Sequence, residues 1–505
     1  MRTKKAIRNL LISILQELVS VFVNFIMTPL IVGTYGSTIN GLVASIKQIM
    51  GYVQLTGAGI SQSSTVAMYK PIANEDYETL NGIYSATNKL FNKAGYVFSA
   101  IVFCVAIVYP FTLDDVNYIT AFALVLVMAI SGASEFFVCG KYTAILTAKQ
   151  DYHIIGIARI AGQLSNLIIC ILMIKLHVGI IIVELGLSAL YVCRILIMYG
   201  YIHRNYKELT NMVGPRFDLI MERKDVIAQQ IAGLVVSGSS TFLASMICGL
   251  KEASIYSVYA LIFAAIHKMC GVISQALASS FGDVISRGNK EILRQAFSVY
   301  ESLYLIVVTI VYTVSYLLAM PLIKIYTSGM TDANYYLPQL ALLFIVVGIS
   351  NNMRYPSLTL INAGGFFKKT RNAAIMEAII NLVAQIVLAS FFGLYGLTLG
   401  CIVSYIFNSN YIIWFSNKHI LGQSCKNTYK RIVINLVVAS IVALWVKHLF
   451  VLNISECVSW CLYAFIFTII VAIFVLTINM IVDKQVFRYL KKRMKMIITP
   501  PPQMR

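Results

Sequence analysis

The chain consists largely of apolar stretches of about 20 residues or more, separated by short polar breaks. Such a stretch predicts a membrane-spanning helix, because a helix satisfies its backbone hydrogen bonds within its own segment. No stretch shows the strand-length alternation that is typical of a membrane barrel. We therefore predict an all-α polytopic membrane protein with about fourteen transmembrane helices, at approximately 9–33, 38–67, 90–111, 117–147, 153–174, 178–200, 227–249, 254–282, 298–323, 337–362, 372–392, 395–416, 432–450 and 457–482.

A weak internal repeat relates the two halves of the chain. Ile145–Ala148 followed by Ser165–Leu167 matches Leu360–Ala363 followed by Ile380–Leu382, at a constant offset of 215 residues. The repeat pairs spans 5 and 6 with spans 11 and 12, and predicts two pseudo-symmetric six-helix lobes plus a C-terminal helix pair. Internal repeats of this kind are characteristic of secondary transporters. The expected domains are an N-terminal lobe at 1–205, a cytoplasmic linker at 206–226, a C-terminal lobe at 227–417, the extra helix pair at 432–482 and a basic cytoplasmic tail at 483–505.

The basic residues are distributed unevenly between the two sides of the predicted membrane. Of the 40 Lys and Arg residues, 31 fall in loops or termini on the side of the N-terminus. Four fall on the other side: Lys175, Lys251, Lys324 and Lys447. An excess of Lys and Arg marks cytoplasmic loops, so both termini are expected in the cytoplasm. We expect localisation in the bacterial inner membrane. The net charge of +19 is expected to contact anionic lipid headgroups of the bilayer and not nucleic acid.

Several charged residues lie inside the predicted spans. A charge at the bilayer centre costs about 2.5–3.5 kcal/mol even on insertion scales, so these residues indicate a wet cavity or internal ion pairs. The proposed cationic substrate-binding residues are Lys47, Lys268, Arg354 and Arg159. The acids proposed for ion coupling or charge balance are Glu17, Glu135 and Glu377. Glu301 lies near a predicted span end, where its carboxylate is expected to reach the interface.

Uncharged polar residues extend these positions along single helix faces. Residues seven apart in a helix share a face, as do Lys47 with Gln54 and Lys268 with Gln275. The proposed polar cavity residues are Asn24, Gln54, Gln230, Gln275 and Asn351. Deep Lys and Arg residues suit an anionic passenger, since Arg offers phosphate oxygens a planar fork. The acids either pair with these cations or bind a coupling H⁺ or Na⁺, and the sequence leaves both alternatives open.

The sequence offers no recognisable catalytic or cofactor chemistry. It contains no Walker loop, no His-Glu-x-x-His, no Gly-x-Ser-x-Gly and no Cys-x-x-Cys. We therefore expect no cofactor, no metal site and no enzymatic activity. Without a nucleotide-binding domain, transport energy has to come from an ion gradient, the substrate gradient or a partner.

Short motifs in order along nearly the whole chain carry a resemblance to a known family. They are Asn9-Leu10-Leu11, Thr28-Pro29-Leu30, Tyr35-Gly36, Asn40-Gly41-Leu42, Gly57-Ala58-Gly59-Ile60, Ala148-Lys149-Gln150-Asp151-Tyr152 and Gly393-Leu394-Tyr395-Gly396. With about fourteen spans, this layout resembles the polysaccharide flippases, which are lipid-linked oligosaccharide translocases for O-antigen, capsule or exopolysaccharide. They form part of the multidrug/oligosaccharidyl-lipid/polysaccharide exporter superfamily.

The resemblance implies two six-helix lobes that alternate between inward-open and outward-open states. Its implied passenger is an undecaprenyl-diphosphate-linked glycan, with a polymerase or glycosyltransferases as candidate partners. It also implies a groove for the isoprenoid tail beside spans 13 and 14.

Three other functions remain alternatives at this point. A peptidoglycan-precursor flippase would share the architecture. A multidrug or organic-cation antiporter of the same superfamily should have a mainly acidic or aromatic cavity, whereas the deep positions here are largely cationic. A membrane glycan polymerase usually needs a large outer loop, and the longest outer connection, 326–337, is short.

Overall fold

The structure is a computed structural model that describes residues 2–57, 59–189, 191–210, 213–220, 224–286, 289–449, 454, 456–484 and 486–490. Within these residues the regular elements are helices, and strands are absent. Most of the predicted basic tail at 483–505 lies outside the described residues.

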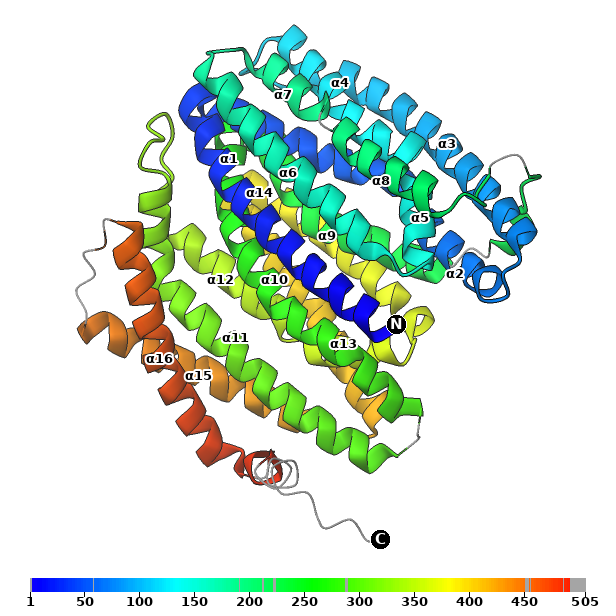
Figure 1. Ribbon diagram of the computed structural model, residues 1–505. Coiled ribbons are helices and arrows are strands. Elements are labelled where there is room, and N and C mark those ends of the chain that lie inside the picture. Colours follow the sequence, from blue (N-terminus) through cyan, green and yellow to red (C-terminus); the bar gives the residue numbers. More distant parts are fainter. Residues whose placement is uncertain are drawn as a thin grey trace, which may run out of the picture. The chain divides into compact units, whose positions relative to one another are not determined.

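The first half of the chain contains ten helical elements of the α type and several short turns of other helix types (Figure 1). The α-helices are α1 (Arg2–Val53), α2 (Ile60–Ala73), α3 (Tyr77–Val108), α4 (Tyr118–Ser134), α5 (Gly140–Ala148), α6 (Tyr152–Lys175), α7 (Ile180–Ala189), α8 (Tyr191–Asn205), α9 (Lys224–Ile247) and α10 (Leu250–Ser286). The 3₁₀ turns are η1 (Gln54–Gly57), η2 (Tyr109–Thr112) and η4 (Phe217–Leu219), and η3 (Glu135–Cys139) is a π-helix.

The second half continues with longer helices. They are α11 (Lys290–Tyr326), α12 (Pro338–Asn352), α13 (Tyr355–Ala363), α14 (Phe367–Phe415), α15 (Lys426–Leu449) and α16 (Cys457–Val482), with a π-helix η5 (Ser416–Leu421) after α14.

The described residues contain eleven helical stretches that are long and apolar enough to cross a membrane. Two of them, Leu11–Ala73 and Phe367–Leu421, are long enough to cross twice. Each contains a glycine with a left-handed backbone, Gly36 (φ 84°) or Gly393 (φ 54°), which breaks the helix where the chain turns. With the interrupted segment formed by α12 and α13, the described helices account for the predicted fourteen spans. The predicted all-α, two-lobed transporter architecture is confirmed.

Three predicted spans are interrupted in their interior. The span at 38–67 is broken by η1 before α2 begins, and the span at 117–147 contains the π-helix η3. The span at 337–362 is divided between α12 and α13 next to Arg354. Predicting these spans as continuous helices was wrong, because apolar composition extends through each interruption. π-Helical insertions and broken spans are frequent at functional sites of membrane proteins.

The chain folds into two compact units. Unit 1 comprises residues 1–258 and 329–333, and unit 2 comprises 259–328 and 334–505. In unit 1, α1 packs on α6 and α9, and α4 lies between α3 and α7. Its apolar core includes Leu42, Ile46, Phe98 and Leu124, which are all inaccessible to solvent. The predicted division into lobes at 1–205 and 227–417 remains a prediction.

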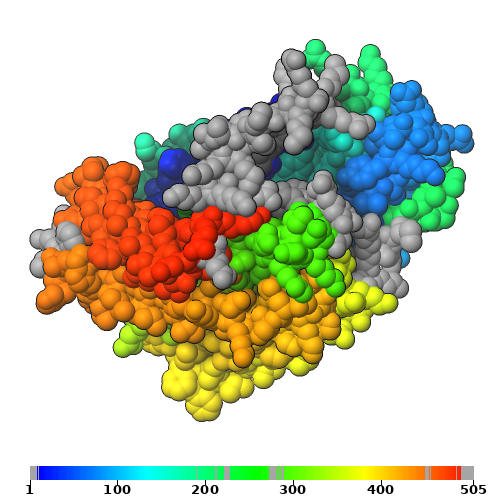
Figure 2. Space-filling model, turned by 90° about the horizontal axis from the view of Figure 1, so that it is seen from below, coloured from blue at the N-terminus to red at the C-terminus, as the bar shows by residue number. Residues whose placement is uncertain are grey.

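Unit 2 is organised around α11. This helix packs on α12, α15 and α16, and α12 packs in turn on α14. Phe467 and Val471 of α16 are fully buried with Leu318 of α11 and Val442 of α15. The outer side of the C-terminal pair, coloured orange to red in Figure 2, carries exposed apolar side chains such as Leu444 and Phe465. Such a surface suits contact with lipid.

The connection between α11 and α12 contributes a short segment, Gly329–Ala333, to unit 1. Asp332 accepts hydrogen bonds from the backbone N–H of Ser37 (2.6 Å) and from its hydroxyl (2.7 Å). It thereby caps the part of α1 that follows the break at Gly36. Burial alone would raise the pKa of Asp332, but the bonds from Ser37 and the charge of Lys251 outweigh it and lower the pKa below its usual range.

Two arginines that were expected in cytoplasmic loops are largely buried within helices. Arg194 belongs to α8 and is 7% exposed. Arg431 belongs to the second turn of α15, and its side chain is 12% exposed. The loop assignment of these two residues was wrong because each lies close to a cluster of loop charges in the sequence.

Candidate functional site

Unit 1 contains a polar, partly open cavity of about 420 Å³. Its lining comes from α1, η1, η3, α6 and α8, which are distant in the sequence. The lining residues are Gln16, Gln54, Glu135, Ala158, Arg159, Gly162, Gln163, Asn166, Tyr191 and Arg194. We call this space the unit-1 cavity. Because its lining is made of charged and amide side chains within predicted spans, it can hold water or a polar ligand.

One face of α6 forms a continuous part of the lining. Arg159, Gly162, Gln163 and Asn166 follow each other at helical spacings of three and four residues, so their side chains share a face. Gly162 opens this face, since a Cβ atom added there would meet no other atom within 4 Å.

An ion pair between a buried arginine and a half-buried glutamate lines another part of the unit-1 cavity. The Arg194 guanidinium donates two hydrogen bonds to the Glu135 carboxylate, at 2.6 and 3.3 Å. The carboxylate belongs to the π-helix η3, whose wider turn interrupts the predicted span at this position. Such bidentate pairing compensates a buried guanidinium that would otherwise be very costly to desolvate.

Arg159 is the charged residue of this lining without an acidic partner. Within the described residues it forms no ion pair, and its side chain is half-buried. Four buried polar atoms of the lining also lack a hydrogen-bond partner among the described residues: Gln16 Oε1, Gln163 Oε1, Asn166 Oδ1 and Arg194 Nε. Native proteins rarely leave such groups unsatisfied, so their concentration here indicates a place for water or a ligand.

Unit 2 contains a second buried ion pair. Arg354 donates to the Glu377 carboxylate at 2.5 Å, and the amide of Asn408 donates to the other carboxylate oxygen. The guanidinium lies 5.2 Å from the ring centroid of Tyr405. Both charged side chains are well shielded, with 12% and 6% exposed. Arg354 is therefore neutralised inside unit 2.

A polar cluster lies one helical turn away, around His267 of α10. The Asn351 amide approaches His267 Nε2 at 3.3 Å, the Asn352 amide approaches Nδ1 at 3.1 Å, and the Tyr355 hydroxyl approaches Nε2 at 3.0 Å. Tyr304 donates to the Asn352 carbonyl oxygen at 2.8 Å. The predicted residue Asn351 thus belongs to a network that links α10, α11, α12 and α13.

The remaining predicted residues do not line the unit-1 cavity. Lys47 and Glu17 in unit 1 and Lys268 in unit 2 are exposed. Asn24 is exposed and donates to the backbone carbonyl of Ser20, and Gln230 donates to the Gln62 side chain at 3.3 Å. The Gln275 side chain lies outside the described residues.

The structure therefore brings together some of the predicted residues within each unit. Gln54, Glu135 and Arg159 meet in the unit-1 cavity, and Arg354 meets Glu377 in unit 2. The common chamber predicted for Lys47, Lys268 and Arg354 remains a prediction.

Sequence reasoning missed more than half of the polar residues in this cavity. Gln163 and Asn166 repeat at helical spacing after Arg159 and could have been found by that spacing. Gln16 directly precedes Glu17, which the sequence reading selected because it is charged. Arg194 was missed because it was counted with the loop charges.

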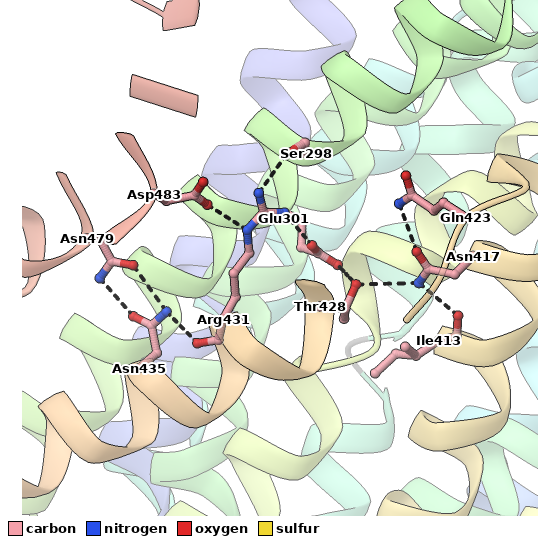
Figure 3. A network of polar contacts seen from close by, with 10 residues as sticks. All are labelled: Ser298, Glu301, Ile413, Asn417, Gln423, Thr428, Arg431, Asn435, Asn479 and Asp483. Atoms are coloured by element: carbon pink, nitrogen blue, oxygen red, sulfur yellow. Dashed lines mark hydrogen bonds and ion pairs between the residues drawn. The ribbon is translucent and has the colours of Figure 1, made fainter. Parts of the chain in front are cut away.

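A third polar network connects the C-terminal helix pair to α11 (Figure 3). Arg431 donates to Glu301 and to Asp483, each at 2.7 Å, and to Ser298 at 2.6 Å. Thr428 also donates to Glu301 at 2.7 Å. Glu301 is 2% exposed, so the expectation that its carboxylate reaches the interface was wrong. The network ties α15 and α16 to α11.

The described residues contain no group of three or more His, Cys, Asp or Glu side chains that is arranged to hold a metal ion. The polar sites described here consist of arginine, amide, hydroxyl and imidazole groups with one or two carboxylates each.

No protein-family model matches the chain, and no curated protein sequence matches it significantly. Solved structures with the same fold are nevertheless found. The lipid II flippase MurJ in an inward-closed conformation superposes with a TM-score of 0.66 at 16% identity, covering 94% of this chain and 99% of that chain. An inward-facing MATE-family multidrug resistance transporter of the MOP superfamily gives a TM-score of 0.64 at 14% identity, covering 84% and 99%.

A third similar structure is a MOP-superfamily transporter from Pyrococcus furiosus, described by the reverse polarity of its binding pocket. It gives a TM-score of 0.55 at 14% identity and covers 83% of this chain and 97% of that chain. At these identities the likeness establishes the fold. The chain is a multi-pass membrane protein with the fold of MOP-superfamily transporters.

Proposed function

We propose that this chain is a flippase that moves an undecaprenyl-diphosphate-linked oligosaccharide across the bacterial inner membrane by alternating access. The glycan would serve a surface polysaccharide such as O-antigen, capsule or exopolysaccharide. In this proposal both termini are cytoplasmic, the glycan crosses through the polar interior, and the isoprenoid tail stays in lipid.

The unit-1 cavity is the observation that carries the proposal. Its charged lining has one carboxylate and two guanidinium groups, and amides supply most of the other polar contacts. Amide and guanidinium groups are suited to the hydroxyl groups and anionic oxygens of a glycan. An apolar organic cation would favour an acidic or aromatic lining instead.

The fold comparison adds separate support. The flippase structure matches 94% of the chain and the MATE structure 84%. The difference is about a tenth of 505 residues, close to the length of the segment from α15 to α16. A helix pair beyond the twelve core spans agrees with a passenger that has a long lipid tail. A peptidoglycan-precursor flippase remains the second candidate on the same grounds.

Lys47, Lys268 and Arg354 remain proposed contacts of the diphosphate. Because Arg354 is paired with Glu377, it would become available to cargo when the carboxylate is neutralised. This gives Glu377 a proposed role in coupling to H⁺, with Na⁺ as the alternative ion. Glu135 would balance charge through Arg194.

The test is translocation of defined lipid-linked glycans by the purified chain in proteoliposomes. We expect Arg159→Gln to reduce the initial rate at least tenfold. The matched control is Lys175→Gln, which removes a positive charge from the exposed end of the same helix and should leave the rate unchanged.

Equal rates in all three proteins would remove the cavity from the transport path. Transport of lipid II in preference to other carrier-linked glycans would favour the second candidate. Export of an organic cation, without movement of either lipid, would contradict the flippase proposal.

A further inference from the structure

The charge of the unit-1 cavity sets the charge of its ligand. The Arg194 guanidinium donates hydrogen bonds to both oxygens of the Glu135 carboxylate, so these two charges compensate each other. The Arg159 guanidinium is then the uncompensated charge of this lining. One free guanidinium balances one negative charge. A carboxylate carries one charge and accepts two parallel hydrogen bonds from Arg. A phosphate monoester carries about −1.5 to −2 near neutral pH and would remain under-compensated.

The hydrogen-bonding groups of the cavity call for a ligand that donates hydrogen bonds as well as carrying a carboxylate. Gln16 Oε1, Gln163 Oε1 and Asn166 Oδ1 are buried acceptors without a partner among the described residues. A carboxylate only accepts hydrogen bonds, so it cannot satisfy an amide oxygen. Hydroxyl groups both donate and accept, and therefore match carboxamides in either orientation of the amide.

The space also fits a ring-sized molecule. At about 420 Å³ the cavity lies within the range of small-molecule sites, and Gly162 leaves open the wall between Arg159 and Asn166. Gln16 and Arg194 are 8% and 7% exposed, so their positions are fixed by packing before a ligand arrives.

We infer that the unit-1 cavity binds a sugar residue bearing one carboxylate, of the uronic acid class, with Arg159 as the contact to the carboxylate and Gln16, Gln163 and Asn166 as contacts to the hydroxyls. The inference rests on the proposed function, because it names a monosaccharide of the glycan that the flippase would carry. It assigns the diphosphate of the carrier to groups outside this cavity.

The experiment measures binding of free monosaccharides to the full chain, purified in detergent, by the shift of its thermal unfolding midpoint. Sodium glucuronate, glucose, sodium phosphate and sodium chloride are compared over concentration series at matched ionic strength. A ligand that binds the folded protein raises the midpoint according to its affinity. Wild type and Lys175→Gln should bind glucuronate at least tenfold more tightly than glucose.

Three variants separate the role of the Arg159 charge from the role of the open space at Gly162. Arg159→Gln should lower the apparent affinity for glucuronate at least tenfold while leaving that for glucose within twofold. Arg159→Lys should recover part of the loss, since it restores the charge without the fork. Gly162→Leu fills the open wall and should abolish binding of both sugars. An unchanged glucuronate affinity in Arg159→Gln would overturn the inference.

Other outcomes distinguish this inference from the proposed function. Tighter binding of phosphate than of glucuronate would overturn the sugar-acid assignment and identify a headgroup site, leaving the flippase proposal intact. Equal shifts with glucuronate and chloride would also overturn it. Binding of glucuronate by a chain that translocates no lipid-linked glycan in proteoliposomes would contradict the proposed function and not the site.

Discussion

Both units contain an arginine–carboxylate pair inside the helix bundle, but the surroundings of the pairs differ. In unit 1 the Glu135–Arg194 pair borders a polar cavity and has Arg159 nearby without an acid. In unit 2 the Arg354–Glu377 pair is enclosed by the Asn408 amide and the Tyr405 ring. In unit 1 the Arg159 guanidinium is available to a ligand, whereas in unit 2 the charges of Arg354 and Glu377 neutralise each other.

The offset of the internal repeat allows the positions of the two ion pairs to be compared. A shift of 215 residues places Arg354 opposite Cys139, one turn after Glu135, and places Glu377 opposite Gly162 on the face that carries Arg159. The acid of the unit-1 pair and the arginine of the unit-2 pair therefore lie at nearly equivalent positions, but their partners do not, since Arg194 is on the sixth predicted span and Glu377 is on the eleventh, which the repeat matches to the fifth. Each half has a charged residue of its pair at a helix break, the acid Glu135 in η3 and the base Arg354 between α12 and α13. We interpret the pair as a structural feature of each half and Arg159 as the addition that gives unit 1 a ligand site.

The largest effect is expected when the enclosed pair of unit 2 is broken. Arg354→Ala leaves the buried Glu377 carboxylate without its cation, which should lower the free energy of unfolding by about 3–5 kcal/mol. Unfolding in detergent by denaturant titration measures this loss. The double variant Arg354→Met/Glu377→Leu should recover most of it, because an apolar pair of similar volume avoids the desolvation cost. A single variant as stable as wild type would show that the pair does not form.

A smaller effect is expected for the pair in unit 1. The Glu135 side chain is 29% exposed and borders a cavity that can hold water, so Arg194→Ala should cost about 1–3 kcal/mol in the same titration. A loss equal to that of Arg354→Ala would contradict the distinction between a wet pair and an enclosed pair.

The next smaller effect on stability is expected at Asp332, which caps the part of α1 that follows Gly36. Asp332→Ala removes the acceptor of two Ser37 hydrogen bonds and should lower the free energy of unfolding by about 1 kcal/mol. Because the pKa of Asp332 is lowered in the folded state, its contribution is present above its ordinary value of 3.8 and is lost as the pH falls through the folded-state pKa. Asp332→Asn should remove this acid-dependent part. The same acid dependence in wild type and Asp332→Asn would assign it to another group.

The smallest effect on stability is expected at Arg159 itself. It has no acidic partner among the described residues, so Arg159→Gln should change the free energy of unfolding by less than about 0.5 kcal/mol. A large loss would mean that Arg159 supports the fold and not the ligand.

Apolar periodicity predicted the fold because each span has to satisfy its own backbone in lipid. It could not predict the interruptions at Gln54, Glu135 and Arg354, since these arise from tertiary packing inside stretches that remain apolar. Charge within a span identified Arg159, Glu135, Arg354 and Glu377 as unusual, because such charges are costly in lipid. It did not identify their partners.

Partner assignment failed for a physical reason. Which acid meets which base depends on helix rotation and crossing, and neither is encoded in local hydropathy. Arg194 shows the consequence, since a residue near a span end was read as a loop charge and is in fact the buried partner of Glu135. Gln163 and Asn166, in contrast, could have been predicted, because their helical spacing places them on the same face of α6 as Arg159.

We propose that the Arg159 guanidinium, which has no acidic partner in the described part of the chain, contacts the passenger. This contact is tested most directly by the initial rate of lipid-linked glycan translocation in proteoliposomes with Arg159→Gln beside Lys175→Gln, at equal protein content and equal thermal stability. We expect at least a tenfold loss of the rate for Arg159→Gln and no loss for Lys175→Gln. Equal rates for the two variants would contradict it.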